Sequence, residues 1–552
     1  MRIASPSIRF SADLNDIINN NLHFKDIQAT SPFIRLHKWD TAKTTANGTA
    51  PPPIRIDQLT ATEPDLMIRI NRNDSVAVMR LPFSENSLVQ ATAIELTDGG
   101  MKLGALKLNT TSATFAKAGG EVLGVEDGKI NMDLSDIQFS NKDGKLKWGG
   151  FINELSLQNA NGLQMGKTKN NLFFQNASLG NVSLSSDLLP DFGQLLKKNV
   201  SAWLRIPQGQ FIDSNTTLQW YNARYNNTTR SLSLDSFIYH PTQPLDTVLA
   251  KAPYQLDYIT FKTGDVTIDG LDVAQYEMDS SFIAQSITIN APLLTVYRDK
   301  LQPLNPNRKD KLLPVEMIRN MSLPVAIEEI NIKDGLIVYG ERNGKSRKEG
   351  TFFLNNVNGK VSHIKNSNLE DDDSLMLQLN AGLMDAADLS LTLNQSYSDS
   401  LSGFLLQAQI GGTDLAFLNT VLAPLSNVKI ASGVLDSLSF KAVGRKDVAL
   451  GEMQMFYNGL RIKLIKGGDP EVSTFWQEAA SVLANTFLIR RANKERKGLM
   501  YFKHLPKQSF VNYIIKTTVS GIATSVGAIR NKKYTKQYNK AIQESNTPPI
   551  KL

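Results

Sequence analysis

Cysteine is absent from this chain of 552 residues, which excludes disulfides, thiolate metal sites and cysteine nucleophiles. Histidine occurs five times, and the two closest histidines are fourteen positions apart, so the short spacing of a local metal-binding pair is missing. The sequence also contains no phosphate-binding glycine loop and no nucleophile elbow. We therefore expect no enzymatic activity, no metal and no other cofactor.

Long apolar runs are missing as well. No uncharged apolar segment reaches eighteen residues, and the nearest approach, residues 510–529, is interrupted by Lys516. The first residues show no charged segment followed by an apolar run, as a secretion signal would. With 41% hydrophobic and 20% charged residues the chain can still bury a large core, and its length suggests roughly three or four domains.

Acidic residues are scarce in one part of the chain. Residues 490–540 contain thirteen Lys or Arg and one acid, Glu495, whereas the remainder of the chain has a net charge of −5. This asymmetry indicates an anionic partner at the C-terminal end.

The dominant pattern in the sequence is alternation of apolar and polar residues, for example in residues 130–134, 375–379 and 389–393. Such alternation places every second side chain on one face of a strand. Five Asn-Gly and five Asp-Gly pairs supply the positive φ angles of tight turns, and we expect Asn458-Gly459 to close a hairpin over residues 451–466. The fold class is therefore predicted to be mostly β, a long curved antiparallel sheet forming a groove of repeated strands.

A short repeat occurs within the alternation: an apolar residue, then Pro or Gly five positions later, then an apolar residue two positions further on. Pro or Gly at such a point releases a ladder hydrogen bond, so the repeat predicts a strand that bends and continues on the same face. Frequent Pro and Gly in an alternating sequence could also produce these matches by chance. The final apolar residues of the seven copies are our candidates for lining a lipid groove: Ile34, Leu66, Phe211, Val266, Leu294, Ile337 and Leu435.

Residues 1–8 fit the same repeat, so the chain opens inside a predicted strand. This favours a further segment before Met1. Four regions are expected: residues 1–185 as the first part of the β-groove, 186–300 with a helix insertion at 191–203, 301–470 after a Pro-rich linker at 300–314, and 471–552 as a basic helical end. A second short helix is expected at 413–422.

Residues 475–540 are predicted to form a mainly helical cap, separate from the β body, that touches a membrane or a membrane-bound partner. Its aromatic and basic residues suit an anionic bilayer. Nucleic acid would also suit the charge, but no nucleic-acid motif occurs and the rest of the chain is acidic, so we expect no nucleic-acid partner. The candidate membrane-contact residues are Phe475, Trp476, Arg490, Arg491, Phe510, Tyr513, Lys532, Lys533 and Lys536.

Three segments carry a resemblance to a known family. They are LPV at 313–315 with IEEINIKDGLIVYGE at 327–341 and GTFFLNNV at 350–357; residues 418–457, including VKIASG at 428–433 and GEMQMFY at 451–457; and the stretch from Phe475-Trp476 to 520–522. These segments resemble the AsmA-like cell-envelope proteins, and among them most closely a group common in Bacteroidetes. The looser repeat extends the similarity over nearly the whole chain.

The resemblance implies a repeating β-groove that projects through the periplasm from an N-terminal helix in the inner membrane. It also implies phospholipid as the cargo or a role in outer-membrane assembly, with an outer-membrane protein as a partner, and it offers no catalytic residues. The anchor helix is absent from this sequence, in keeping with the expected segment before Met1. We expect a non-enzymatic envelope protein whose apolar groove binds phospholipid acyl chains; the alternative is a structural or adhesive all-β protein with closed sandwich domains and no lipid conduit.

Overall fold

The computed structural model is mostly β, as the alternation predicts, and consists of two compact units. Unit 1 comprises Met1–Phe237 and Asp269–Asp279, and unit 2 comprises Ile238–Ile268 and Ser280–Leu552. The described residues are 2–19, 21–37, 52–72, 75–81, 85–97, 100–111, 113–117, 121–125, 128–142, 145–158, 171–186, 192–344, 346–425, 428–464 and 489–544.

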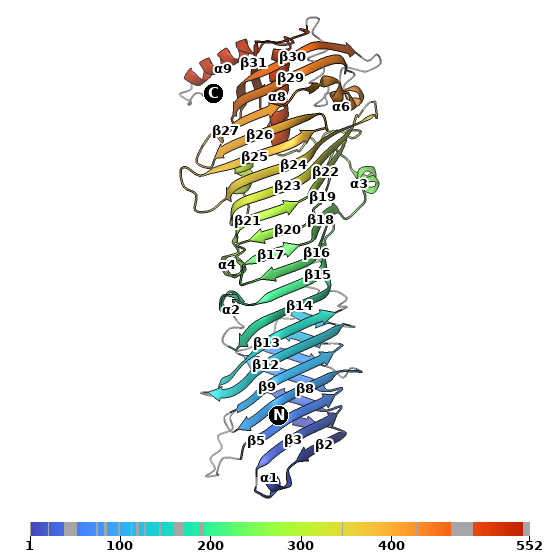
Figure 1. Cartoon of the computed structure of the whole chain (residues 1–552), viewed down its shortest axis with the longest axis vertical. Coiled ribbons are helices and arrows are strands. Elements are labelled where there is room, and N and C mark those ends of the chain that lie inside the picture. The colour runs from blue at the N-terminus through green and yellow to red at the C-terminus, as the bar shows by residue number, and fades with distance from the viewer. Residues whose placement is uncertain are drawn as a thin grey trace. The chain divides into compact units, whose positions relative to one another are not determined.

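Unit 1 contains strands β1 to β17 and three short helices among its described residues. Figure 1 labels many of these elements. In chain order they are β1 (Arg2–Ala4), β2 (Ser7–Ala12), α1 (Leu14–Ile18), β3 (Leu22–Thr30), β4 (Phe33–His37), β5 (Ile54–Thr62), β6 (Asp65–Arg72), β7 (Ser75–Leu81), β8 (Leu88–Thr97), β9 (Gly100–Thr110), β10 (Ala113–Lys117), β11 (Glu121–Val125), β12 (Lys129–Lys142), β13 (Lys145–Gln158), β14 (Asn171–Ser185), α2 (Phe192–Lys198), β15 (Trp203–Ile212), β16 (Thr216–Asn226), β17 (Ser231–Leu234) and α4 (Val273–Asp279).

The strands of unit 1 lie in two sheets. One has the order β1-β4-β6-β7-β10-β11, and the other runs from β2 through β3, β5, β8, β9 and β12 to β16. The chain passes from the second sheet into the first at Ser31, between β3 and β4, and again at Glu63, between β5 and β6. Two pairs in this unit are parallel, β3 with β5 and β4 with β6, so the expectation of a purely antiparallel fold is corrected to a mixed one.

Unit 2 holds the longest strands and the C-terminal helices (Figure 1). In chain order its elements are β18 (Ser236–Pro241), α3 (Leu245–Lys251), β19 (Asp257–Lys262), β20 (Val266–Asp269), β21 (Phe282–Asn290), β22 (Leu293–Asp299), α5 (Pro314–Arg319), β23 (Val325–Arg342), β24 (Glu349–Lys365), β25 (Ser374–Leu383), β26 (Ala387–Ser396), β27 (Phe404–Ile410), β28 (Thr413–Asp414), η1 (Leu415–Leu418), α6 (Asn419–Leu425), β29 (Val428–Gly444), β30 (Val448–Leu464), β31 (Lys497–Lys503), α8 (Phe510–Ser525) and α9 (Lys532–Glu544).

The sheet of unit 2 is built around β23. β21 and β22 both pair with β23 in parallel, one after the other along its length. From β23 onward the strands β24, β25, β26, β27, β29, β30 and β31 follow one another as antiparallel neighbours.

The predicted bends are confirmed at four of the seven copies of the repeat. At four copies of the repeat the residue directly before Pro or Gly has a positive φ: Ser31 (45°), Glu63 (50°), Ala291 (45°) and Asp334 (52°). The first three separate two strands, whereas Asp334 lies within the continuous strand β23, where the pairing with β24 shifts register. A residue in the left-handed region turns the strand locally, and this is the bend that the repeat predicts.

The predicted hairpin at Asn458-Gly459 is wrong. Strand β30 runs without interruption through this pair, and Gly459, with a φ of 64°, lies beside register shifts between β29 and β30. Asn358-Gly359 likewise lies inside β24, whereas Asn343-Gly344 connects β23 to β24 as a turn. The same dipeptide can therefore lie inside a strand or in a connection between strands, and of these described pairs Gly459 is the one with a positive φ.

The helices agree with the sequence in part. α2 falls within the predicted 191–203, and η1 with α6 covers the predicted 413–422, with Asp414 accepting a hydrogen bond from the Ala416 amide at 2.9 Å. Residues 300–313 contain no helix or strand, as expected for a linker. The expectation that the C-terminal cap is separate from the β body is wrong, because β31 pairs with β30 and α8 packs on β31.

Candidate functional site

The sheet of unit 2 has an apolar face made of side chains in direct register across nine strands. Two adjacent rows contain only aliphatic, aromatic, methionine and glycine residues. Row 1 is Ile287, Ile330, Val361, Leu377, Leu393, Leu406, Ala442, Gly451 and Met500; row 2 is Ile289, Ile332, Gly359, Leu379, Leu391, Ala408, Phe440, Met453 and Gly498.

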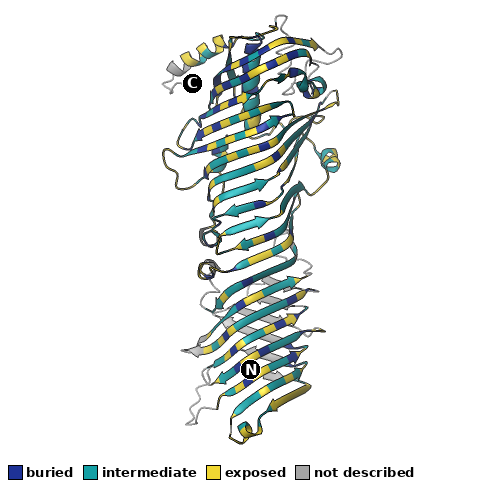
Figure 2. Ribbon diagram, viewed as in Figure 1, coloured by how far each residue is buried: buried dark blue, intermediate teal, exposed yellow. Residues whose placement is uncertain are grey.

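The opposite face of the same strands is polar. The row between the two apolar rows is Thr288, Asn331, Lys360, Gln378, Thr392, Gln407, Lys441 and Glu452 from β21 to β30. Because neighbouring residues of a strand point to opposite faces, these side chains lie on the other side of the sheet. Figure 2 shows the alternation of buried and exposed residues along these strands.

Burial of the apolar face changes along the rows. In row 1 the residues from β21 to β25 are half-buried, and burial is complete from Leu393 on β26 onward. In row 2 the residues from β21 to β26 are half-buried, and burial is complete from Ala408 on β27 onward. The apolar face therefore leads from a closed core onto strands where it keeps contact with solvent.

Helix α8 covers the buried end of the apolar face at very close range. A methyl group added at Gly521 would lie 2.8 Å from both Met453 and Met500, and one added at Gly498 would lie 2.7 Å from the Gly521 carbonyl oxygen. Tyr513 on α8 is 1% exposed, donates to the Arg445 carbonyl at 3.0 Å and packs edge-on against Phe404. These glycines allow the helix and the sheet to touch along their backbones.

Helix α5 covers one margin of the apolar face. Val315 is 2% exposed and clusters with Ile327, Ile364 and Leu375, against which the half-buried Ile330 packs. The Val315 amide donates to Oε1 of Gln395, a side chain that is 0% exposed. The hydrogen bond satisfies a polar group that would otherwise weaken this apolar margin.

The other margin of the face ends in ion pairs. Ile337 on β23 pairs with Leu354 on β24, which in turn pairs with Leu383 on β25. Alternation places Leu383 on the same face as Leu379 of row 2. Ile337 and its partner Leu294 on β22 therefore also lie on the apolar face. Val296 and Tyr339 follow two positions further along these strands, and the register partners Arg298 and Glu341 follow four positions further. We call Asp257, Arg298, Lys300 and Glu341 the charged margin.

Short contacts hold the charged margin together. Arg298 donates to both carboxylate oxygens of Asp257 at 2.6 Å, while Lys300 Nζ lies 2.8 Å from Oε1 of Glu341. Tyr339 donates to Oε2 of Glu341 at 2.7 Å. Glu341 is only 1% exposed, so its charge depends on these two partners.

The pKa shifts keep Tyr339 neutral and Arg298 of the charged margin charged. Burial raises the pKa of Tyr339 far above its usual value, and the Glu341 charge adds to the effect, so Tyr339 remains a donor. Burial alone would lower the pKa of Arg298, but the bond to Asp257 outweighs it and raises that pKa. At Tyr297, the residue between Val296 and Arg298, burial and then the bond to Glu349 raise the pKa to about 12.

Residues 300–313, which we call the strap, join the two margins. Lys300 belongs to the charged margin, and at the other end Leu313 is 1% exposed in the core cluster beneath α8. The strap is held by a hydrogen bond from the Lys311 amide to the Pro506 carbonyl at 2.7 Å. Between its ends it exposes apolar side chains, with Leu301 41%, Leu304 49% and Leu312 40% exposed.

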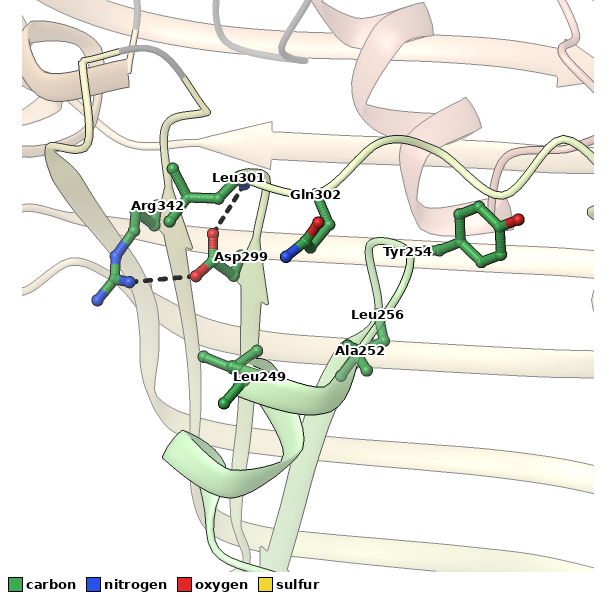
Figure 3. A pocket seen from close by; sticks show the side chains of 9 residues that line it. Leu249, Ala252, Tyr254, Leu256, Asp299, Leu301, Gln302 and Arg342 are labelled. Carbon is green, nitrogen blue, oxygen red and sulfur yellow. Dashed lines mark hydrogen bonds and ion pairs between the residues drawn. The ribbon is translucent and has the colours of Figure 1, made fainter.

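A small pocket opens at the start of the strap (Figure 3). Leu249, Ala252 and Leu256 line it together with Leu301, and Asp299 binds Arg342 at 3.1 Å on its polar side. Its volume of about 210 Å³ is below the roughly 300–1,000 Å³ of typical small-molecule sites. Arg342 also donates to Glu349 at 2.9 Å, so its charge is already matched. We therefore take the apolar face, not this pocket, as the candidate site.

Unit 1 repeats the same design independently. One apolar row crosses ten strands as Ile8, Ala29, Ala61, Val89, Leu108, Met132, Leu155, Leu179, Leu204 and Tyr225. The neighbouring row on the opposite face begins Arg9, Gln28, Thr60, Gln90, Lys107, Asp133 and Glu154. The apolar row ends on β2 at Ile8, whose side chain is 53% exposed.

The seven predicted groove residues occupy different environments. Leu294 and Ile337 are half-buried register partners on the apolar face, and Ile34 and Leu66 are register partners on β4 and β6, although their side chains lie outside the described part. Phe211 is half-buried on β15. Val266 is 7% exposed, and Leu435 is 3% exposed in the core beneath α8, so Leu435 is a core residue in this structure.

The predicted membrane-contact residues also divide. Phe475 and Trp476 lie outside the described residues, whereas Arg490, Arg491, Lys532, Lys533 and Lys536 are exposed. Phe510 is half-buried and packs edge-on against Phe404 with ring centroids 5.1 Å apart, and Tyr513 is buried, so the aromatic face of α8 meets the sheet. Among the described residues no helix combines the length and the apolar character needed to cross a bilayer.

Alternation predicted which residues of each strand share a face, but not which residues of neighbouring strands lie opposite one another. The charged margin, the strap and the glycine contacts of α8 were missed. The Pro-rich composition of 300–314 indicated a linker, and only the fold shows that it joins both margins of the apolar face. No protein-family model and no curated protein sequence matches the chain, so the AsmA-like resemblance stays a prediction.

Proposed function

We propose that this protein is a non-enzymatic, lipid-binding protein that holds acyl chains along the apolar face of its sheet. The observation that carries the proposal is the continuity of rows 1 and 2 from the closed core under α8 onto half-buried strands. From β21 to β26 there are four strand spacings, about 19 Å in all. That length suits one acyl chain, since each leaflet contributes roughly 15 Å to a bilayer's hydrocarbon core.

The energetic argument concerns the acyl chain in water. Each CH₂ removed from water contributes about 0.8 kcal/mol, so a sixteen-carbon chain gains roughly 12 kcal/mol when it is fully covered. A sheet face covers one side of the chain and leaves the other to the strap or to a second chain. Movement along the rows keeps the same apolar surface beside the chain, which favours conduction without a chemical step.

The charged margin supplies a polar border for the lipid head group. At the end of the apolar face Arg298 is paired with Asp257 and Lys300 with Glu341, so this border carries two cations and two anions that already balance one another. Such a balanced border suits a zwitterionic head group better than a strongly anionic one. The AsmA-like resemblance adds the cell envelope as the proposed location, with phospholipid carried between membranes or supplied for outer-membrane assembly.

A photo-crosslinking experiment tests the acyl-chain proposal. The photoreactive residue benzoyl-phenylalanine is placed at Leu377 or Ile337 on the apolar face, and at Gln378 as a matched control, because it neighbours Leu377 and points to the opposite face. The purified protein is irradiated with phospholipid vesicles and its mass is measured. We expect lipid adducts at Leu377 and Ile337 and none at Gln378.

Two outcomes would overturn the proposal. Equal labelling at Leu377 and Gln378 indicates non-specific lipid contact, and labelling at neither position together with no co-purifying lipid indicates no lipid site. The second outcome favours the structural alternative, in which another surface closes over the apolar face. Small-angle scattering of the same sample then distinguishes compact sandwich domains from an extended sheet.

A further inference from the structure

The exposed cations of the C-terminal end come together from two chain segments. Arg490, Arg491 and Lys494 come from the first segment, and Arg530, Lys532, Lys533 and Lys536 come from the second; all seven are exposed, and we call them the basic surface. Glu495 is the one acidic residue in the sequence from 489 to 536.

The last turn of α8 brings the two segments together. The Arg490 amide donates to the Val526 carbonyl at 3.0 Å, and its Cγ would lie 3.4 Å from a methyl group added at Gly527. Arg496 donates to the Ser525 carbonyl. Arg530 follows this turn within a few residues, so both segments meet at the end of α8.

Helix α9 presents its lysines in a fixed orientation. Asn531, just before the helix, donates to the Leu499 carbonyl and to Ser520 Oγ, both at 2.7 Å. Tyr534 stacks on Tyr501 with centroids 5.6 Å apart, and Tyr538 donates to Asp447 at 3.3 Å. The helix is thus tied to the body on one side and exposes Lys532, Lys533 and Lys536 on the other.

The internal electrostatics of the fold account for only part of this charge. A cation near the C-terminus of a helix is stabilised by the helix dipole, which explains Arg490 and Arg496 beside α8. Lys532 and Lys533 begin α9, whose first turn has no acidic residue, and there the dipole disfavours a cation. Like charges gathered at an unfavourable position indicate an anionic partner outside the chain.

We infer that the basic surface docks the protein onto an anionic phospholipid bilayer. Each Lys or Arg near such a surface adds about 1 kcal/mol of attraction. Base stacking by Tyr534 and Tyr538 would favour nucleic acid, but the Tyr534 ring already stacks on Tyr501 and the Tyr538 hydroxyl donates to Asp447. Docking by the basic surface is a separate claim from acyl-chain binding. Because the two use different residues, an experiment can disprove the docking while acyl-chain binding stands.

A vesicle-sedimentation experiment tests the inference with the full chain. The variant replaces Lys532, Lys533 and Lys536 by Gln. Its matched control replaces Lys429, Lys441 and Lys463, three exposed lysines of β29 and β30, and so removes the same charge elsewhere. Vesicles of phosphatidylcholine mixed with phosphatidylglycerol are compared with phosphatidylcholine alone, and circular dichroism checks the fold.

We expect the wild type and the control to bind the anionic vesicles, and the α9 variant to bind about 100-fold more weakly, as three lost cations imply. High salt should weaken wild-type binding, because screening acts over about 10 Å at 0.1 M. Equal losses in both variants, or equal binding to neutral vesicles, would overturn the inference. Duplex DNA that binds more tightly and displaces the vesicles would overturn it in favour of nucleic acid. Leu377 crosslinking in the α9 variant reports separately on acyl-chain binding.

Discussion

Ala291 and Asp334 lie opposite each other on the neighbouring chain segments β21–β22 and β23, and both have left-handed backbone conformations, with φ of 45° and 52°. The Ala291 amide donates to the Lys333 carbonyl at 2.8 Å, and the Leu336 amide donates back to the Pro292 carbonyl at 2.7 Å. The bend between β21 and β22 and the bend within β23 are therefore hydrogen-bonded to each other, so the neighbouring segments bend at the same point.

The bend at Ala291 predicts that an Ala→Gly substitution has opposite effects on the free energy of unfolding at the bend and in a regular strand. Ala291→Gly should raise the free energy of unfolding by up to about 1 kcal/mol, because glycine adopts this φ without strain. Ala326→Gly, in the regular part of β23, should lower it by about 0.5–1 kcal/mol. Urea titration of both variants measures the difference. A loss of stability in both would show that the bend at Ala291 stores no strain.

The contact between α8 and the sheet predicts an order of effects. Gly498→Ala should lower the free energy of unfolding by about 1–3 kcal/mol, because the new methyl group meets the Gly521 carbonyl, a backbone atom. Gly521→Ala should cost less, because its methyl group meets the flexible side chains of Met453 and Met500 and alanine favours the helix. Thermal unfolding of the two variants gives the order, and the reverse order would contradict this account of the packing.

The sequence predicted the β class, the faces of the strands and the bends, because each depends on residues close together in the chain. Register depends on partners chosen across the sheet, and so the parallel pairing of β21 and β22 with one strand, β23, was missed. Asn458-Gly459 shows the limit of local signals. Its positive φ was predicted, but whether the chain turns depends on continued pairing with β29.

The C-terminal end shows a second limit. The aromatic spacing of Phe510 and Tyr513 predicted an apolar helix face correctly, but such a face fits a sheet as well as a membrane. The structure places both side chains against Phe404. Lys532, Lys533 and Lys536 of α9 were predicted to contact a membrane, which requires a surface position, and all three are exposed. The membrane contact itself stays a prediction.

Glu316 anchors the end of the strap and predicts a pH dependence. It accepts from the Leu313 amide at 3.0 Å and from Ser402 at 2.9 Å, and it pairs with Lys446. Burial would raise its pKa, but the bond to Lys446 and the other bonds outweigh it and lower the pKa below 4.5. A lowered carboxylate pKa contributes stability that is present above 4.5 and is lost as the pH falls through the folded value.

Glu316→Gln should therefore lower the free energy of unfolding by about 1–2 kcal/mol at pH 7, and by less at acidic pH. Urea unfolding of the wild type and the variant across that range measures the difference. Glu328→Gln, an exposed residue of β23, is the control. A difference that stays constant with pH would mean that the Glu316 charge is not what holds the strap.

His23 predicts a local titration in unit 1. Its Nε2 lies 2.9 Å from Asp57 and its Nδ1 lies 3.3 Å from Asp16 in α1, and these acids, Asp57 first, raise its pKa above 6.5. The protonated form is favoured, so the interaction is present below 6.5 and is lost as the pH rises through the folded value. NMR titration of the ring should give a pKa above 6.5, and Asp57→Asn should move it back; an unchanged pKa in the variant would exclude the pair.

The strap predicts a response to lipid that can be read at one residue. Because the chain has no cysteine, Leu304→Cys carries a fluorescent label at a unique position. Leu304 is 49% exposed on the segment that joins the charged margin to the core under α8. If acyl chains lie on the apolar face, the exposed strap leucines gain by covering the side of the chain that the sheet leaves open. Added phospholipid should then shift the emission of this label to shorter wavelength.

The control places the same label at Thr392→Cys, an exposed position of β26 on the polar face. Its emission should stay unchanged, because no acyl chain reaches that side of the sheet. Equal shifts at both positions would indicate partition of the label itself into lipid. An unchanged label at Leu304, in a sample whose Leu377 crosslinks to lipid, would show that the strap takes no part in holding the acyl chain and serves only to connect β22 to α5.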